Sequence, residues 1–216
     1  MIQYEAFTDN SSDPPVRGFL HLPTNGIGDG LVFTHGAGGN SRNPLLVTLA
    51  EKLSEAGFIV LRCDLPFRQS RPNGPPRPGD APRDRLGLKN AVAAMRKLAH
   101  GRVFLGGQSY GGRQATILCA EENSLVDGLL LTSYPLHPPG KPSQMRTQHF
   151  PQLHVRALFA QGTRDPFATI QEITAALKLI PAPVDLLPVE GLGHDLGSKG
   201  ATIVANWARQ YWTAAG

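Results

Sequence analysis

The chain has 216 residues, of which 41% are hydrophobic and 18% charged, and its formal net charge is +4. This balance is typical of a globular protein, and we expect one domain spanning residues 1–216. Lysine and arginine are spread along the chain rather than grouped in blocks, which argues against nucleic-acid binding. Because no leader segment and no membrane-crossing apolar run is present, we expect a soluble, cytoplasmic protein without membrane association.

Short apolar runs alternate with longer amphipathic stretches along the chain. The sequence opens with an expected hairpin, formed by 2–7 and 14–23. Strands that are apolar throughout are expected at 30–35, 58–66, 102–107, 126–136, 155–162 and 183–191. Helices are expected at 44–56, 84–100, 109–122 and 198–214. Two proline-rich stretches, 65–83 and 137–152, interrupt the alternation and are interpreted as long surface loops.

The pattern of these elements predicts the fold class. Strands that are apolar along their whole length are typical of a sheet that is buried on both faces. We therefore predict an α/β fold with a mostly parallel sheet, helices on both faces and antiparallel N-terminal strands at one edge. Cys63 and Cys119 lie within apolar segments, so two buried thiols are expected rather than a disulfide.

A G-x-S-x-G pattern follows the strand at 102–107 and opens the next helix. It reads Gly107-Gln108-Ser109-Tyr110-Gly111. At such a turn the serine takes a strained backbone conformation, and its neighbours are glycines because a Cβ atom would collide with the strand or the helix. The alternative is a plain glycine-rich turn. The placement between strand and helix favours a nucleophilic serine, Ser109.

A serine nucleophile needs a base and an orienting acid, which in this architecture follow it in the order acid, then histidine. Asp165 comes just beyond one apolar strand, and His194 lies in a glycine-rich loop after the next. His194 is expected to take the proton from Ser109 and to return it to the leaving group. Asp165 is expected to hold the imidazole in the productive tautomer.

Other interpretations of these residues are open at this point. Asp165 is also placed to be the N-cap of a helix after Pro166, and His194 to be an exposed loop histidine. Glu190 and Asp195 are rival acids, but both lie so close to His194 in sequence that they would reach its ring awkwardly.

An oxyanion formed at Ser109 needs two backbone N–H donors. One is expected from Tyr110, the residue after the nucleophile, and the other from Ala37 in the glycine-rich loop after the first parallel strand. His35, at the start of that loop, is expected to hydrogen-bond within the loop rather than to move protons.

No cofactor or metal is expected. The glycine pairs at 36–38 and 191–193 lack the final glycine of a dinucleotide-binding motif. The sequence also contains no phosphate-binding loop and no histidine pair spaced with a glutamate to hold zinc.

The stretch 62–85 contains six arginines, and most of it follows a strand end. One of them, Arg68, or Arg113 on the nucleophile helix, is a candidate for pairing with an anionic group on the substrate. The alternative is a solvated loop, with Arg113 in a structural ion pair.

With these motifs placed, the chain resembles the α/β-hydrolase superfamily over nearly its whole length, and within it the small lid-less branch related to dienelactone hydrolases. The stretches 34–39, 107–113 and 133–137 together resemble the "KANL/Tex" group, which contains bacterial proteins expected to be hydrolases and eukaryotic relatives found in chromatin complexes. Dienelactone hydrolases have a cysteine where this chain has Ser109, so their activity does not carry over.

The resemblance implies the α/β-hydrolase fold and a catalytic apparatus, but not a substrate. From the placed residues we expect a serine-dependent esterase that acts on carboxyl esters or thioesters through an acyl-enzyme. Its partner is then a small-molecule ester, and we expect a monomer or homodimer. The roughly eighteen residues between Leu136 and Val155 contain several prolines, so no cap domain is expected. An open site of this kind should prefer acyl groups of about two to four carbons. The alternative is a non-catalytic interaction protein that keeps the fold.

Overall fold

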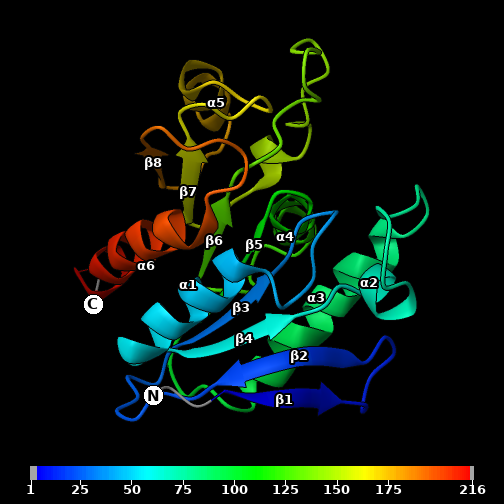
Figure 1. Cartoon of the computed structure of the whole chain (residues 1–216), viewed down its shortest axis with the longest axis vertical. Coiled ribbons are helices and arrows are strands. Elements are labelled where there is room, and N and C mark those ends of the chain that lie inside the picture. The colour runs from blue at the N-terminus through cyan, green and yellow to red at the C-terminus, as the bar shows by residue number, and fades with distance from the viewer. Residues whose placement is uncertain (1–3, 215–216) are drawn as a thin grey trace.

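The computed structural model describes residues 4–214, in which eight strands form one sheet (Figure 1). The strands are β1 (Tyr4–Asp9), β2 (Val16–His21), β3 (Gly30–Thr34), β4 (Ile59–Cys63), β5 (Val103–Gln108), β6 (Gly128–Thr132), β7 (Ala157–Gly162) and β8 (Val184–Val189). They lie in the order β1-β2-β4-β3-β5-β6-β7-β8. The β1–β2 and β2–β4 pairs are antiparallel and all others are parallel, as the sequence predicted.

Helices cover both faces of this sheet. On one face α1 (Pro44–Glu55) and α6 (Gly197–Ala214) lie side by side (Figure 1). The other face carries α3 (Ala81–Arg96), α4 (Tyr110–Glu121) and α5 (Ile170–Leu177). The short helix α2 (Pro66–Ser70) and a 3₁₀ turn, η1 (Phe150–Gln152), lie in the connections. The observed architecture is the α/β fold that the sequence predicted.

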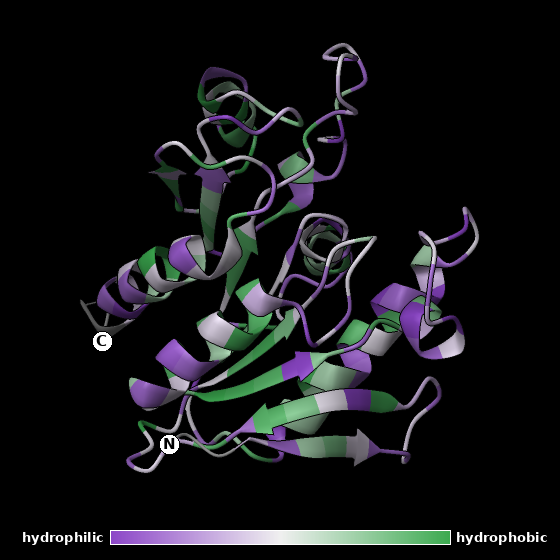
Figure 2. Cartoon of the chain, in the orientation of Figure 1, coloured by the Kyte–Doolittle hydropathy of each residue, from purple (hydrophilic) through white to green (hydrophobic). Residues whose placement is uncertain are grey.

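The central strands are apolar throughout because their alternate side chains enter two different cores. In β3, Val32 packs with the α3–α4 face, whereas Leu31 and Phe33 pack with the α1–α6 face. Figure 2 shows these strands in green, between helices that are green and purple on different sides. Trp212 of α6 is fully buried and stacks on Phe104 of β5, with 4.0 Å between the ring centroids, so the last helix is tied to the sheet.

The predicted strands and helices are present, with ends shifted by up to four residues. Residues 2–3 of the first predicted strand lie outside the described residues, and the strand that is observed runs from Tyr4 to Asp9. Cys63 and Cys119 are free and buried, as expected, and burial raises the pKa of each thiol to about 12.

The prediction of a long surface loop over 65–83 was only partly right, because residues 71–80 form an exposed irregular stretch between two helices. Helix α2 begins at Pro66, and α3 already begins at Ala81. Proline was interpreted as a loop signal, but here it occupies the first turn of both helices, where its missing N–H has no partner to lose. The side chain of Phe67 in α2 is buried against the sheet core.

The connection between β6 and β7 carries no lid. Residues 133–156 are all described, and η1 is their only helical turn. The predicted absence of a cap domain is therefore confirmed. Within residues 4–214, none of the helices combines the length and the apolar character needed to span a membrane.

Candidate active site

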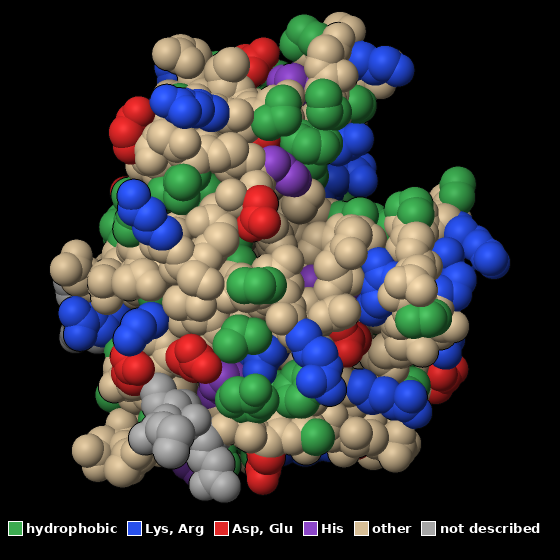
Figure 3. Space-filling model, in the orientation of Figure 1, with side chains coloured by type: hydrophobic (Ala, Val, Ile, Leu, Met, Phe, Trp, Pro, Cys, Tyr) green, Lys and Arg blue, Asp and Glu red, His purple; other side chains and the backbone are tan. Residues whose placement is uncertain are grey.

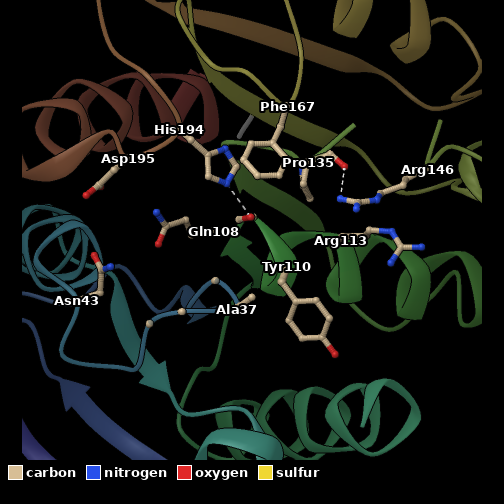
Figure 4. A pocket seen from close by; sticks show the side chains of 14 residues that line it. Ala37, Asn43, Gln108, Tyr110, Arg113, Pro135, Arg146, Phe167, His194 and Asp195 are labelled. Atoms are coloured by element: carbon tan, nitrogen blue, oxygen red, sulfur yellow. Dashed lines mark hydrogen bonds between the residues drawn. The ribbon is translucent and has the colours of Figure 1, made fainter. Parts of the chain in front are cut away.

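The carboxyl ends of the parallel strands meet at one edge of the sheet, and three of them bring the predicted residues together. Ser109 follows β5, Asp165 follows β7, and His194 lies in the loop between β8 and α6. The Nε2 atom of His194 is 2.8 Å from Oγ of Ser109 (Figure 4). Its Nδ1 atom is 2.8 Å from Oδ2 of Asp165. The three side chains form one continuous hydrogen-bonded chain.

Ser109 lies on a strained turn between β5 and α4. Its φ of 50° and ψ of −116° fall outside the regions that residues with a side chain normally adopt. A Cβ atom on Gly107 would lie 2.7 Å from the backbone nitrogen of Gly112, and one on Gly111 would lie 2.5 Å from the carbonyl oxygen of His35. The flanking glycines are therefore required by close backbone approach, and the turn presents the hydroxyl at the first residues of a helix.

The carboxylate of Asp165 is held in one orientation. Its side chain is fully buried, Oδ1 accepts a hydrogen bond from the Phe167 N–H, and Oδ2 accepts one from Nε2 of Gln161 at 2.7 Å. Gln161 is in turn fixed by the N–H of Tyr134. The sequence analysis missed Gln161, although a polar residue at the end of the apolar strand β7 was a signal for it.

The rival interpretations of the acid do not match the geometry. The N-cap of α5 is Thr169, which forms a capping box with Glu172, so Asp165 does not cap that helix. Glu190 accepts a hydrogen bond from a threonine hydroxyl, and Asp195 accepts one from the backbone at the start of α6.

The imidazole of His194 is partly covered by an aromatic ring. Phe167 lies with its ring centroid 4.1 Å from that of His194, at an interplanar angle of 31°. One quarter of the histidine side chain stays exposed. Phe167 therefore limits the movement of the imidazole while leaving Nε2 open toward Ser109. Nothing local in the sequence indicated this residue.

His35 anchors the loop after β3. It is buried; its Nδ1 atom donates to the carbonyl of Gly36 at 2.8 Å, and its Nε2 atom accepts from the N–H of Leu65 at 3.1 Å. Accepting at Nε2 requires the neutral ring, and burial lowers the pKa of His35. The expectation that His35 bonds within its own loop is confirmed.

The backbone N–H groups of Ala37 and Tyr110 are both available at the site. Within residues 4–214 neither donates a hydrogen bond, and both residues lie below His194 in Figure 4. The Tyr110 side chain points away from the pocket, and its hydroxyl donates to the buried carboxylate of Asp84 at 2.8 Å. Because that carboxylate also accepts from the N–H of Phe67, the start of α4 is fixed to α2 and α3.

Arg68 does not reach the site, which corrects its candidacy as a substrate contact. Its guanidinium is buried behind the loop after β3, where it donates to the carbonyls of Gly39 at 2.7 Å, Ala37 at 3.0 Å and Gly74 at 2.9 Å. The solvated-loop alternative fits residues 71–80, which are irregular and mostly exposed. Three arginines of the wider stretch form ion pairs: Arg71 with Asp80, Arg83 with Asp13 and Arg85 with Glu121.

A cavity of about 560 Å³ opens above Ser109 and His194. Its volume suits a small molecule. The loop after β3 forms one wall, and Arg113 and Arg146 lie in the wall on another side. In the described part of the chain, no three His, Cys, Asp or Glu side chains gather in a way that could hold a metal ion.

The sequence and the fold were compared with those of known proteins. Residues 28–212 match the alpha/beta hydrolase domain family. Similar solved structures include a serine hydrolase homologue from Coxiella burnetii (18% identity, TM-score 0.76, 98% of both chains). They also include dienelactone hydrolase from Anabaena variabilis (22%, 0.76, 99% of this chain and 98% of that one) and a lid-less serine hydrolase from Xanthomonas campestris (17%, 0.70, 97% and 93%). At these identities the structures show a shared fold, and because the family match covers most of the sequence, the chain belongs to the alpha/beta hydrolase domain family.

Proposed function

We propose that the protein is a serine hydrolase that cleaves small carboxyl esters or thioesters through an acyl-enzyme intermediate. The observation that carries this proposal is the hydrogen-bonded chain from Ser109 through His194 to the buried carboxylate of Asp165. This chain ends at an open cavity, where a substrate carbonyl can approach the serine hydroxyl.

The first half of the reaction forms the acyl-enzyme. The Oγ atom of Ser109 attacks the carbonyl carbon while Nε2 of His194 takes the hydroxyl proton, and Asp165 stabilises the resulting imidazolium. The carbonyl oxygen becomes negatively charged and accepts hydrogen bonds from the N–H groups of Ala37 and Tyr110. The bond to the leaving group then breaks, and that group takes the proton from His194.

The second half removes the acyl group with water. His194 takes a proton from a water molecule, whose oxygen attacks the acyl carbon. The bond to Ser109 breaks, its Oγ atom recovers the proton from His194, and the carboxylic acid leaves. Each proton that His194 accepts is returned within the same half-reaction, so no co-reactant besides water is needed.

A serine-directed fluorophosphonate probe tests this proposal. We expect the probe to label the wild-type protein, and we expect Ser109→Ala to abolish labelling while melting at the same temperature. A folded protein that is not labelled and cleaves no ester would contradict the proposal. That result would favour a non-catalytic interaction protein.

The absence of a lid supports a preference for short acyl groups. Without a deep apolar tunnel, each methylene that stays in water forgoes about 0.8 kcal/mol of binding free energy. We expect kcat/KM for p-nitrophenyl esters to be highest at about two to four acyl carbons, without activation at an oil–water interface. A steady rise from acetate through butyrate and octanoate to palmitate would contradict this preference.

A further inference from the structure

Two arginines stand in the wall of the cavity on the same side of the nucleophile. Arg113 lies on α4, one helical turn after Ser109, and Arg146 lies in the connection between β6 and β7. Figure 4 shows the Arg146 guanidinium turned toward Pro135, with Arg113 beside it. Asp195, the one acidic residue among those that line the cavity, lies on the opposite side.

Neither arginine has a counter-charge. Within residues 4–214 the Arg113 side chain donates no hydrogen bond, and its Nε atom is buried without a partner. Arg146 donates from Nη1 to the carbonyl of Pro135 at 3.2 Å. No carboxylate of the described residues lies within ion-pair distance of either guanidinium. A buried donor without a partner costs free energy, which a bound acceptor recovers.

The pKa shifts of neighbouring groups reflect the positive charge of Arg113. Burial, and next to it the charge of Arg113, lowers the pKa of Arg146. The same two causes lower the pKa of His149 to about 4, and this histidine lies 2.8 Å from the hydroxyl of Thr116 on α4. Figure 3 shows Lys and Arg side chains down the right-hand flank, where Figure 1 places the connection after β6 and the helices α2 and α3. The wall is therefore cationic and lacks an internal anion.

We propose that Arg113 and Arg146 bind a carboxylate of the substrate, so that the preferred esters are small and anionic. This inference rests on the proposed hydrolase function and narrows its substrate class. A guanidinium binds the planar carboxylate through parallel N–H···O bonds. Because a helix rises about 6 Å over the four residues from Ser109 to Arg113, the carboxylate must stand only a few bonds from the scissile carbonyl. Monoesters of succinate and glutarate have this spacing.

The test compares anionic and neutral esters of matched size. Hydrolysis of monoethyl succinate and monoethyl glutarate is followed by NMR beside ethyl butyrate, and 3-acetoxypropionate is included to carry the carboxylate on the alcohol. We expect kcat/KM to be at least about tenfold higher for one anionic type than for the neutral ester. The anionic ester with the higher kcat/KM shows whether the acyl half or the alcohol half of the substrate faces the arginines. Added salt should reduce this preference.

Variants assign the preference to the two arginines. Arg113→Gln and Arg146→Gln are each expected to lower the anionic-to-neutral ratio of kcat/KM by about tenfold. Lys141→Gln is the matched control, because it removes an exposed positive charge from the same connection as Arg146. It is expected to keep both the activity and the ratio. Thermal melting verifies that each variant is folded.

Titration with succinate, which requires no catalysis, separates the two proposals. Binding to the wild type and to Lys141→Gln, weakened in both arginine variants, supports the anion site even if no ester is cleaved. Equal rates for anionic and neutral esters, together with no succinate binding, would overturn the inference while leaving the hydrolase proposal intact. Failure of every ester and of the fluorophosphonate probe would instead overturn the hydrolase proposal.

Discussion

The buried arginines behind the loop after β3 and the arginines in the cavity wall differ in their hydrogen-bond partners. Behind the loop after β3, Arg62 is buried and donates to Nε2 of His21 at 2.8 Å and to the carbonyl of Ser41, while its guanidinium lies 4.9 Å from the ring centroids of Tyr4 and Phe19. Arg68, described above, donates to several carbonyls of neighbouring loops. We call this pair the rear arginines.

The cavity arginines, Arg113 and Arg146, make one side-chain hydrogen bond between them to the described residues. The two pairs have the same chemistry, so the difference lies in what the surrounding backbone offers. The backbone carbonyls around the rear arginines accept hydrogen bonds from the buried guanidinium groups, which in turn hold those loops in place. The cavity wall instead leaves guanidinium N–H groups without an internal acceptor, so that a ligand can accept from them. We infer that changes behind the nucleophile act on stability and that changes at the cavity act on rate.

The largest expected effect is at the proposed catalytic residues, Ser109 and His194. Ser109→Ala and His194→Ala should each lower kcat by at least about 10⁴-fold, because the nucleophile or its base is lost. Their melting temperatures should stay at the wild-type value, measured by circular dichroism. A variant that lost activity only by unfolding would break the distinction between the two regions.

Asp165→Asn comes next in size. The amide has only one acceptor oxygen, and its NH2 group facing Nδ1 of His194 holds the imidazole in the wrong tautomer, so turnover should fall on the order of 10³ to 10⁴-fold. Glu190→Gln is the matched control, since its carboxylate bonds to a threonine hydroxyl rather than to the imidazole. Near-full activity of Asp165→Asn combined with loss in Glu190→Gln would show that the acid is Glu190.

A rear substitution should affect stability instead. Arg68→Met removes donors from several part-buried carbonyls, and we expect the free energy of unfolding in urea to fall by about 2 to 4 kcal/mol. Arg77→Met, at an exposed position of the same stretch, should change it by less than about 0.5 kcal/mol. Arg113→Met should change the free energy of unfolding little, because its side chain has no hydrogen-bond partner among the described residues to lose. If Arg113→Met lowered the free energy of unfolding as much as Arg68→Met, the distinction between the rear and the cavity arginines would be wrong.

The smallest effect is a dependence of stability on pH. Burial, and next to it the charge of Arg62, lowers the pKa of His21 to about 4, below the value of about 6.5 in an unfolded chain. Between these values the unfolded state binds more protons, so stability should fall as the pH decreases from about 6.5 to 4. His149, with a pKa of about 4, acts in the same direction.

His21→Gln therefore tests one part of this dependence. The variant should lose about 1 to 2 kcal/mol less than the wild type between pH 6.5 and 4, measured by urea unfolding at each pH. His149→Gln should likewise reduce the loss of stability between pH 6.5 and 4, because it removes the second histidine with a lowered pKa. Identical pH profiles for the wild type and His21→Gln would show that His21 is not kept neutral by its burial beside Arg62.

The candidate catalytic residues could be identified from sequence because their signals are local. An apolar strand followed by Gly107 to Gly111 indicates the turn at Ser109 without knowledge of any distant contact. The parallel order of the strands then brings Asp165 and His194 to the same edge of the sheet. Helix α2 was missed because proline occurs both in loops and in the first turn of helices, and only packing distinguishes the two. Helix α5, which begins after the Thr169 cap, was not among the expected helices either.

The sequence by itself determined the α/β fold, the Ser109–His194–Asp165 chain and the absence of a lid, since each follows from patterns within a few residues and from the rule that parallel strands share an edge. Tertiary structure alone decided which arginines are satisfied. Arg68 and Arg146 look alike in sequence, but one meets carbonyls from loops about thirty residues away and the other meets the cavity. A long, flexible side chain takes its role from the groups that distant segments bring to it, and the same holds for Gln161 beneath Asp165 and Phe167 over His194.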